Sequence, residues 1–273
     1  MEQKKILFIT QEVDHFLPSS KIAEISKYMA EKASSDFDIR IFTPKYGVIK
    51  DRQKQLHDVI RLSGINIIVN DEDHPLLVKV ASAPDTRLQV YFVDNDEFFK
   101  RQNLFGEDKK HSYSNAERGI FFVRGVMEAI KKLRWVPDIV HCVGWFSAFA
   151  PIYIKTYYKD DPCFGNVKVV FSSSTREEVA SIGNNVKEVL AFDGITEDLA
   201  YCVINEPDSN GLRKLGLQWA DAISFFTEDD DPQLADITKV IDPEKNNLTK
   251  VSNDNQQIVE MHYDLYHQIL GNE

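Results

Sequence analysis

The chain has 273 residues, enough to bury a substantial core as one large α/β domain or two small ones. Its formal net charge of −11 argues against a nucleic-acid-binding protein, because a phosphate backbone demands a basic face. No run of about 18 apolar residues occurs, so no membrane span is expected, and the apolar run in "MEQKKILFIT" is too short for a signal peptide.

The three cysteines, Cys142, Cys163 and Cys202, are scattered and form no C-x-x-C pair. They indicate reduced thiols in a cytoplasmic protein. No metal site is expected, because the histidines are spread out. The one close pair, His262 and His267, is five residues apart and does not share a helix face.

The first elements predict a doubly wound sheet. Residues 4–10 are a nearly continuous apolar run, typical of a strand covered on both faces. Residues 21–33 carry apolar side chains at helical spacing, with Ser20 as the N-cap, and residues 37–44 form a second strand. This βαβ unit opens a Rossmann-like fold. The Gly-x-Gly-x-x-Gly signature is absent after the first strand, so NAD is not expected and no cofactor is predicted.

The middle of the chain has a different pattern. The runs "INIIVN", "LLVKVASA" and "LQVYFVD" are separated by turn signals and predict an antiparallel meander or edge hairpin inserted into the parallel sheet. Residues 97–115 are polar and aromatic and predict a long surface loop, a kind of loop that is often functional. Asn115 is expected to cap the amphipathic helix that follows.

The remaining pattern predicts one Rossmann-like domain over residues 1–273. Residues 229–255 are expected to be a polar linker that leads to a C-terminal helix over 256–270, which packs back across the domain. The elements expected before this linker are a strand over 138–142, a helix over 146–158, a strand over 167–172 and a last strand over 222–226.

Several stretches together resemble the N-terminal half of bacterial glycogen/starch synthases. They are "KILFITQE", "TPKYG" (43–47), "YFVDNDEFF" (91–99), "SNAERGIFFVRGVMEAIKKLRWVPDIVHC" (114–142) and "GWFSAFAPIYIK" (144–155). The resemblance runs from about residue 3 to about residue 240 and is strongest over 91–155. It implies one half of the two-domain GT-B fold of retaining glucosyltransferases. In that family the N-terminal domain holds the acceptor glucan, and the C-terminal domain holds most of the ADP-glucose.

Two family motifs depart from their pattern in this chain. The motif K-T-G-G-L-A-D matches "SSKIAEI", which places Lys21 at the lysine but puts Ile22 and Ala23 where flexible residues let the backbone approach a phosphate. The motif H-C-H-D-W reads "HCVGW", so the resemblance keeps His141 and Trp145. Val143 and Gly144 stand in place of the histidine beside the reacting sugar and the aspartate.

The resemblance also implies that a donor-binding domain, with its Arg, Lys and Glu, lies outside these residues. A retaining transferase needs those groups to neutralise the departing diphosphate. The expectation is a chain that is inactive on its own, has no intact catalytic residue and binds α-glucan or ADP-glucose, with a separate chain supplying the donor half.

Each candidate substrate-binding residue also has a structural interpretation. Lys21 is either a phosphate contact or a solvated lysine at a helix start. His141 either positions a sugar or is a core histidine tied to the backbone. Trp145 either stacks on a sugar or packs in the core.

The remaining candidates are equally open. Asp94 and Asn95, which the resemblance places near the acceptor channel, could instead cap a turn. Arg118 could bind glucan or form a surface ion pair with Glu117 or Glu128.

Two acidic groups invite a catalytic interpretation. The segment "TEDDD" (227–231) is expected to be a solvated loop and not a metal site. Asp193, Glu197 and Asp198 resemble a catalytic carboxylate set, but a place on a surface loop is favoured, because glycosidase acids need burial and a raised pKa.

Three functions remain open. The first is a glucosyltransferase that is active only with a separate donor chain. The second is a non-catalytic relative that binds α-glucan or regulates a polysaccharide enzyme. The third is an unrelated small-molecule-binding Rossmann module.

Overall fold

The computed structural model describes residues 3–17, 20–84, 86, 88–101, 104–106, 112–174, 179–226, 247–251 and 254–271. The strands are β1 (Lys5–Thr10), β2 (Asp38–Pro44), β3 (His57–Asp58), β4 (Ile65–Val69), β5 (Glu72–Ser82), β6 (Gln89–Asp94), β7 (Ile139–Val143), β8 (Lys168–Ser174), β9 (Ala222–Phe226) and β10 (Asn247–Val251). The α-helices are α1 (Lys21–Ala33), α2 (Asp51–Lys54), α3 (Asp96–Phe99), α4 (Asn115–Leu133), α5 (Phe149–Lys155), α6 (Val186–Phe192), α7 (Tyr201–Asn205), α8 (Ser209–Trp219) and α10 (Asn255–Ile269), with 3-10 turns η1 (Ile60–Leu62) and η2 (Trp145–Ser147).

The strands form one mixed sheet in the order β10-β9-β8-β7-β1-β2-β6-β5-β3, with β4 pairing β5 outside this path. The six strands from β9 to β6 are all parallel, in the order of a doubly wound dinucleotide-binding fold. β5 is antiparallel to β6, β4 and β3. The predicted α/β class, a mostly parallel sheet with an antiparallel insertion, is therefore confirmed.

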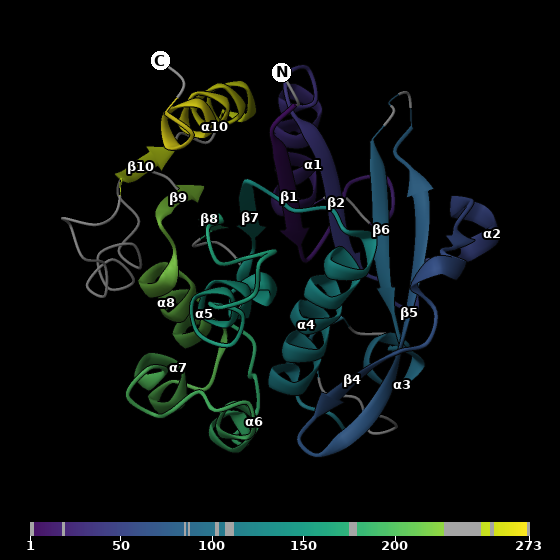
Figure 1. Cartoon of the computed structure of the whole chain (residues 1–273), viewed down its shortest axis with the longest axis vertical. Coiled ribbons are helices and arrows are strands. Elements are labelled where there is room, and N and C mark those ends of the chain that lie inside the picture. The colour runs from purple at the N-terminus through teal and green to yellow at the C-terminus, as the bar shows by residue number, and fades with distance from the viewer. Residues whose placement is uncertain are drawn as a thin grey trace.

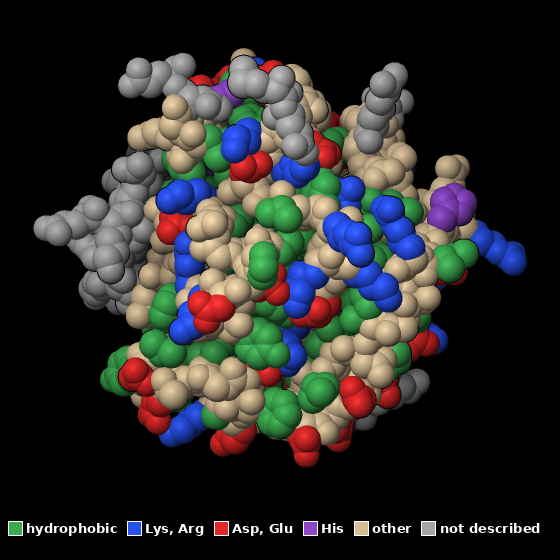
Figure 2. All heavy atoms as spheres, in the orientation of Figure 1, with side chains coloured by type: hydrophobic (Ala, Val, Ile, Leu, Met, Phe, Trp, Pro, Cys, Tyr) green, Lys and Arg blue, Asp and Glu red, His purple; other side chains and the backbone are tan. Residues whose placement is uncertain are grey.

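Helices cover both faces of this sheet. In Figure 1, α1 and α10 lie on one face, and α4, α5 and α8 lie on the other. Figure 2 shows acidic, basic and hydrophobic side chains interspersed over the face seen in Figure 1, the pattern of a solvated surface.

Local sequence explains the main elements. β1 is buried along nearly its whole length, as its apolar run predicts. The hydroxyl of Ser20 accepts a hydrogen bond from the backbone of Ala23, so Ser20 is the N-cap of α1, as predicted. At α4 the N-cap is Ser114 and not Asn115. Ser114 forms a capping box with Glu117, in which each side chain satisfies the other residue's backbone donor.

Other expectations are corrected. The strand over 222–226 is not the last, because β10 follows it and pairs parallel with it inside the predicted polar linker. Residues 229–246 of this predicted linker lie outside the described residues. The predicted loop over 97–115 overlaps α3, whose Phe98 and Phe99 are fully buried. The predicted helix over 146–158 is a 3-10 turn followed by the shorter α5. The short helices α6 and α7 were not predicted.

α10 packs along α1, so the first and last helices of the described fold lie side by side. Ile258 and Tyr266 are fully buried against the core. The described part of the chain contains no helix that is both long and apolar enough to cross a membrane.

Candidate functional site

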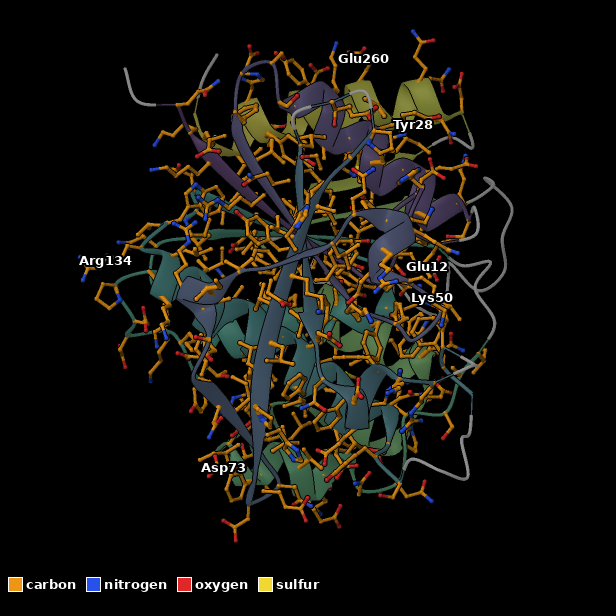
Figure 3. The ribbon with its side chains drawn as sticks, turned by 90° about the vertical axis from the view of Figure 1, so that its right-hand side faces the viewer. Glu12, Tyr28, Lys50, Asp73, Arg134 and Glu260 are labelled. Atoms are coloured by element: carbon orange, nitrogen blue, oxygen red, sulfur yellow. The ribbon has the colours of Figure 1, made fainter. Side chains whose placement is uncertain are left out.

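The carboxyl ends of the parallel strands form the edge where ligands bind in open α/β sheets, above all where the strand order reverses. In this fold the reversal lies between β1 and β7, which are neighbours in the sheet but far apart in the chain. Figure 3 shows Glu12 and Lys50, which follow the carboxyl ends of β1 and β2, on the side of the molecule opposite Arg134, which precedes β7.

The switch point is filled by the side chain of Gln11, which is only 2% exposed. Its carboxamide oxygen accepts a hydrogen bond of 3.2 Å from the backbone nitrogen of Phe146. Gly144 lies directly beneath it with φ of +82°, and a Cβ at that position would stand 2.4 Å from the Gln11 oxygen. An Asp cannot replace Gly144 unless Gln11 moves.

Val143 ends β7 between Thr10 and Ser172 of the neighbouring strands and is fully buried. Its side chain has no polar atom, so it can neither donate a hydrogen bond to a sugar hydroxyl nor carry a proton. At this position the side chain packs in the core and offers no catalytic or hydrogen-bonding group.

His141 belongs to a buried hydrogen-bond network. Its Nδ1 lies 2.6 Å from the hydroxyl of Tyr266, and its Nε2 lies 2.6 Å from Oγ of Ser172. Ser172 contacts Ser224 at 2.6 Å, and Ser224 contacts Nε2 of His262 at 2.7 Å. His141 is thus a core histidine, but side chains hold it and not the backbone, contrary to the structural interpretation from the sequence.

The backbone fixes the direction of this hydrogen-bond chain. Nδ1 of His262 lies 2.7 Å from the carbonyl oxygen of Ile258, which can only accept, so this nitrogen carries the proton and Nε2 accepts. Oγ of Ser224 is the nearer donor to this Nε2, at 2.7 Å against 3.1 Å for Oγ of Ser172, and with Ser224 as the donor it accepts from Ser172. Ser172 then accepts from Nε2 of His141, and Nδ1 of His141 accepts from Tyr266. In this direction each imidazole is neutral, with one nitrogen that donates and one that accepts.

Burial supports the neutral state of both rings. It lowers the pKa of His141 well below the usual value, and the neighbouring His262 lowers it further. Burial also lowers the pKa of His262 to about 4.

Trp145 and Lys21 make internal contacts. Trp145 is 2% exposed and packs against the rings of Phe105 and Phe146. This agrees with the interpretation that Trp145 packs in the core. The ammonium of Lys21 donates to the side-chain oxygen of Asn255 in α10. Lys21 therefore joins α1 to α10 at a partly exposed position.

Asp94 and Asn95 differ in role. Asn95 caps α3 by accepting from the backbone of Glu97, and its amide donates to the carbonyl oxygen of Pro75 at 3.0 Å. The Asp94 carboxylate lies 4.0 Å from the ammonium of Lys79. Burial raises the pKa of Asp94, although Lys45 and Lys79 oppose that shift.

Arg118 does not form the expected surface ion pair. It is fully buried, its Nε donates to the carbonyl oxygen of Phe98 at 2.7 Å, and its Nη1 donates to the side-chain oxygen of Asn115. Its guanidinium also lies over the rings of Phe99 and Phe146. It holds the α3 segment against α4.

The three predicted surface carboxylates do not form one group. Asp193 has a side chain only 5% exposed, which pairs with Arg124 at 2.8 Å and accepts from the Tyr153 hydroxyl at 2.6 Å. Its expected place on a surface loop is therefore wrong. Burial raises its pKa. Glu197 forms an exposed pair with Lys187, and Asp198 accepts from Thr196.

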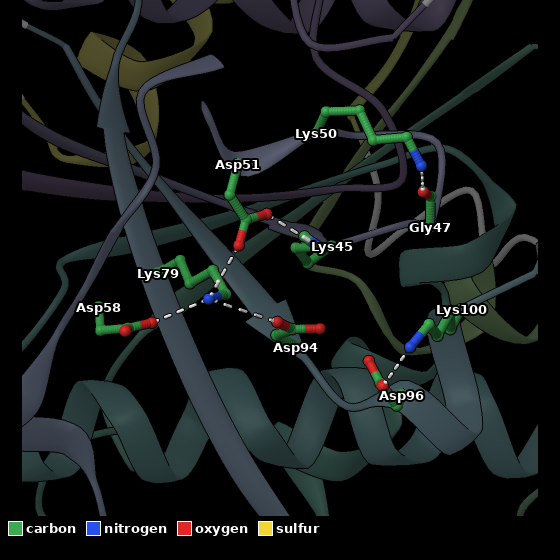
Figure 4. A network of polar contacts seen from close by, with 9 residues as sticks. All are labelled: Lys45, Gly47, Lys50, Asp51, Asp58, Lys79, Asp94, Asp96 and Lys100. Atoms are coloured by element: carbon green, nitrogen blue, oxygen red, sulfur yellow. Dashed lines mark hydrogen bonds and ion pairs between the residues drawn. The ribbon is translucent and has the colours of Figure 1, made fainter. Parts of the chain in front are cut away.

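Sequence reasoning missed a polar pocket of about 570 Å³ at the carboxyl ends of β2 and β6. Figure 4 shows the ion-pair network beside it, in which Lys79 contacts Asp51, Asp58 and Asp94. The pocket is lined by Lys45, Gly47, Ile49, Lys50, Asp51, Arg52, Gln53, Asp94, Asp96 and Lys100. The stretch "TPKYG" and the polar residues after it were the available signal.

Residues that could hold a metal are not grouped in the described part of the chain, where no three His, Cys, Asp or Glu side chains converge. Segment 227–231 lies outside the described residues. Cys142, Cys163 and Cys202 are free thiols.

Comparisons with known proteins agree with this geometry. The family profile described as "Starch synthase catalytic domain" matches residues 5–225. The chain is 38% identical over 174 residues to the glycogen synthase of Chlorobium luteolum, covering 62% of this chain and 35% of that protein. It is 40% identical over 172 residues to the glycogen synthase of Chlorobaculum tepidum, with 61% and 35% covered. The matches thus span about a third of the length of these relatives.

A solved structure has the same fold. The catalytic domain of starch synthase IV from Arabidopsis thaliana, bound to ADP and acarbose, aligns with a TM-score of 0.67 at 14% identity, covering 91% of this chain and 52% of that one. The expected fold, half of a GT-B glycosyltransferase, is confirmed.

Proposed function

This chain belongs to the starch synthase catalytic domain family, and on that premise we propose that it is an α-glucan-binding member whose own residues do not transfer glucose. The proposal rests on one observation: the end of β7 presents Val143 and Gly144, and the Gln11 side chain fills the space above them.

Catalysis requires groups that bind the transition state more tightly than the substrate. A residue without a polar atom at Val143, and a glycine backbone closed over by Gln11, supply no such group at the switch point. We therefore assign no catalytic residue to this edge. The glucan would contact the carboxyl edge of the sheet.

Two assays test this function. The purified chain is incubated with radiolabelled ADP-glucose and glycogen, with the glycogen synthase of Chlorobaculum tepidum as the active control. We expect no label in the polymer, and incorporation by this chain alone would overturn the non-catalytic assignment. Electrophoresis through gels with and without glycogen tests binding. We expect retardation only in the glycogen gel, and equal migration in both gels would contradict glucan binding.

A second candidate is a transferase completed by a donor domain on a separate chain. The structural match, which covers 91% of this chain and 52% of the neighbour, supports it, because one half of the two-domain fold is matched. Activity that appears only when a second chain is added would establish it. The unrelated binding module has no support once the family is assigned.

We propose further that residues 1–273 act as one domain and that the protein works in the cytoplasm. The free thiols suit a reducing compartment.

A further inference from the structure

The pocket at the ends of β2 and β6 is a small-molecule site by size. Its volume of about 570 Å³ lies within the range of about 300–1,000 Å³ typical of such sites. It is bounded by residues that follow β2, by the short α2 and by the α3 segment. A volume of this size accommodates one or two sugar rings.

Most of the residues around the pocket have a charged or amide end group. Eight of the ten lining residues carry a charged or amide side chain, and none is aromatic. Their end groups can form hydrogen bonds with hydroxyl groups, while Ile49 and the aliphatic stems of the lysines give the pocket apolar surface.

The charges of the lining are not balanced. Lys45 pairs with Asp51 at 3.1 Å, and Lys100 pairs with Asp96 at 2.7 Å. Lys50 donates to the carbonyl oxygen of Gly47 at 2.9 Å. Within the described residues, neither Lys50 nor Arg52 has a carboxylate at ion-pair distance. Lys50 and Arg52 are therefore the lining cations without a carboxylate partner within the described residues.

The pocket also contains the buried carboxylate of Asp94. The Asp94 side chain is 9% exposed and has Lys79 at 4.0 Å. An ionised carboxylate accepts hydrogen bonds only, so it suits the hydroxyl groups of a ligand and repels an anion. The pocket therefore combines two cations that have no carboxylate partner within the described residues with a group that accepts from hydroxyls.

We propose that this pocket binds an anionic sugar derivative, either a sugar phosphate or a sugar acid. Lys50 and Arg52 hold the anionic group, and Asp94 accepts from sugar hydroxyls. Charge-assisted hydrogen bonds from Arg and Lys are the strong contacts of such a site. This ligand is distinct from the neutral α-glucan of the proposed function, so either assignment can fail without the other.

Titration calorimetry of the intact chain tests the site with glucose 6-phosphate, gluconate, inorganic phosphate and glucose. We expect glucose 6-phosphate or gluconate to bind more tightly than both inorganic phosphate and glucose, and the stronger of the first two identifies the anionic group. Glucose binding as tightly as the better anionic probe, inorganic phosphate matching it, or no heat from any probe would each overturn the proposal.

Variants locate the site. The exposed pair K50A/R52A should weaken the better anionic probe by at least about tenfold, about 1.4 kcal/mol. The control K132A/R61A removes the same charges elsewhere. Lys132, like Lys50, donates to a backbone carbonyl oxygen at 2.9 Å, and Arg61 is exposed. Equal weakening in both variants, or none in K50A/R52A, would refute the assignment. Glycogen-gel retardation of K50A/R52A should match that of the unmodified chain.

Discussion

The carboxamide of Gln11 lies against Gly144 so closely that a Cβ on Gly144 would stand only 2.4 Å from the carboxamide oxygen. This contact closes the crevice between β1 and β7 with a side chain that also binds the backbone of Phe146. The contact makes Gly144 a structural requirement of this chain.

Replacing Gly144 by Ala should lower the free energy of unfolding by more than the same change at Gly64. Both glycines have positive φ, so each alanine pays a backbone strain of about 1–3 kcal/mol, but nothing lies within 4 Å of a Cβ at Gly64. Urea unfolding measures the difference, which reports the clash with Gln11. The added variant Q11A should recover part of the loss. Equal losses in G144A and G64A would contradict the packing described here.

Acid should destabilise the protein through the buried histidines. The pKa of His262 is about 4 in the folded state and about 6.5 in an unfolded chain, so the unfolded state binds more protons between these values. Stability should therefore fall as the pH drops from about 6.5 to about 4, by up to about 3 kcal/mol for this residue. The side chains that contact the two imidazole rings are those of Tyr266, Ser172 and Ser224.

Urea unfolding at a series of pH values measures this slope. H262Q should flatten the slope while lowering stability at neutral pH. The exposed His57 provides the control, and H57Q should leave the slope unchanged. An unaltered slope in H262Q would show that His262 does not cause the loss of stability in acid.

The hydrogen-bond chain predicts a tautomer for each buried ring. We expect His141 to carry its proton on Nε2 and His262 on Nδ1, which nitrogen-15 NMR of the ring signals distinguishes. Y266F removes the donor to Nδ1 of His141 and should cost about 1–3 kcal/mol, because a buried acceptor loses its partner. The opposite tautomer on His262 would contradict the derived direction.

The buried pair of Arg124 and Asp193 should matter more than an exposed pair. D193A leaves the guanidinium without its carboxylate and should lower stability by about 3–5 kcal/mol. E197A breaks the exposed pair with Lys187 and should cost less than about 1 kcal/mol. Thermal unfolding followed by circular dichroism compares the two variants. Similar losses of stability would show that burial does not strengthen the contribution of the Arg124–Asp193 pair.

Elements set by local chemistry were predictable from the sequence. The Ser20 cap, the stripe of α1 and the buried run of β1 depend on neighbours in the chain, and the structure has them as predicted. Alternating short strands also predicted the antiparallel insertion.

Features made by distant residues were not predictable in the same way. The apolar spacing over 256–270 predicts a stripe of Ile258, Met261, Leu265 and Ile269. Ile258 and Leu265 are buried, but Met261 and Ile269 are only partly buried, and His262 and Tyr266 complete the buried face. Their burial depends on Ser172 and Ser224, which only the sheet brings together. Gln11 was missed for the same reason, because its partner Phe146 is 135 residues away.

The bond between Lys21 and Asn255 joins residues 234 positions apart. During synthesis, the nascent chain must therefore hold β7, β8 and the flank of α1 uncovered until the ribosome delivers the segment that carries His262 and Tyr266. Closure of the fold is thus timed by translation, and a ribosome stalled before that segment would carry a domain open along one face.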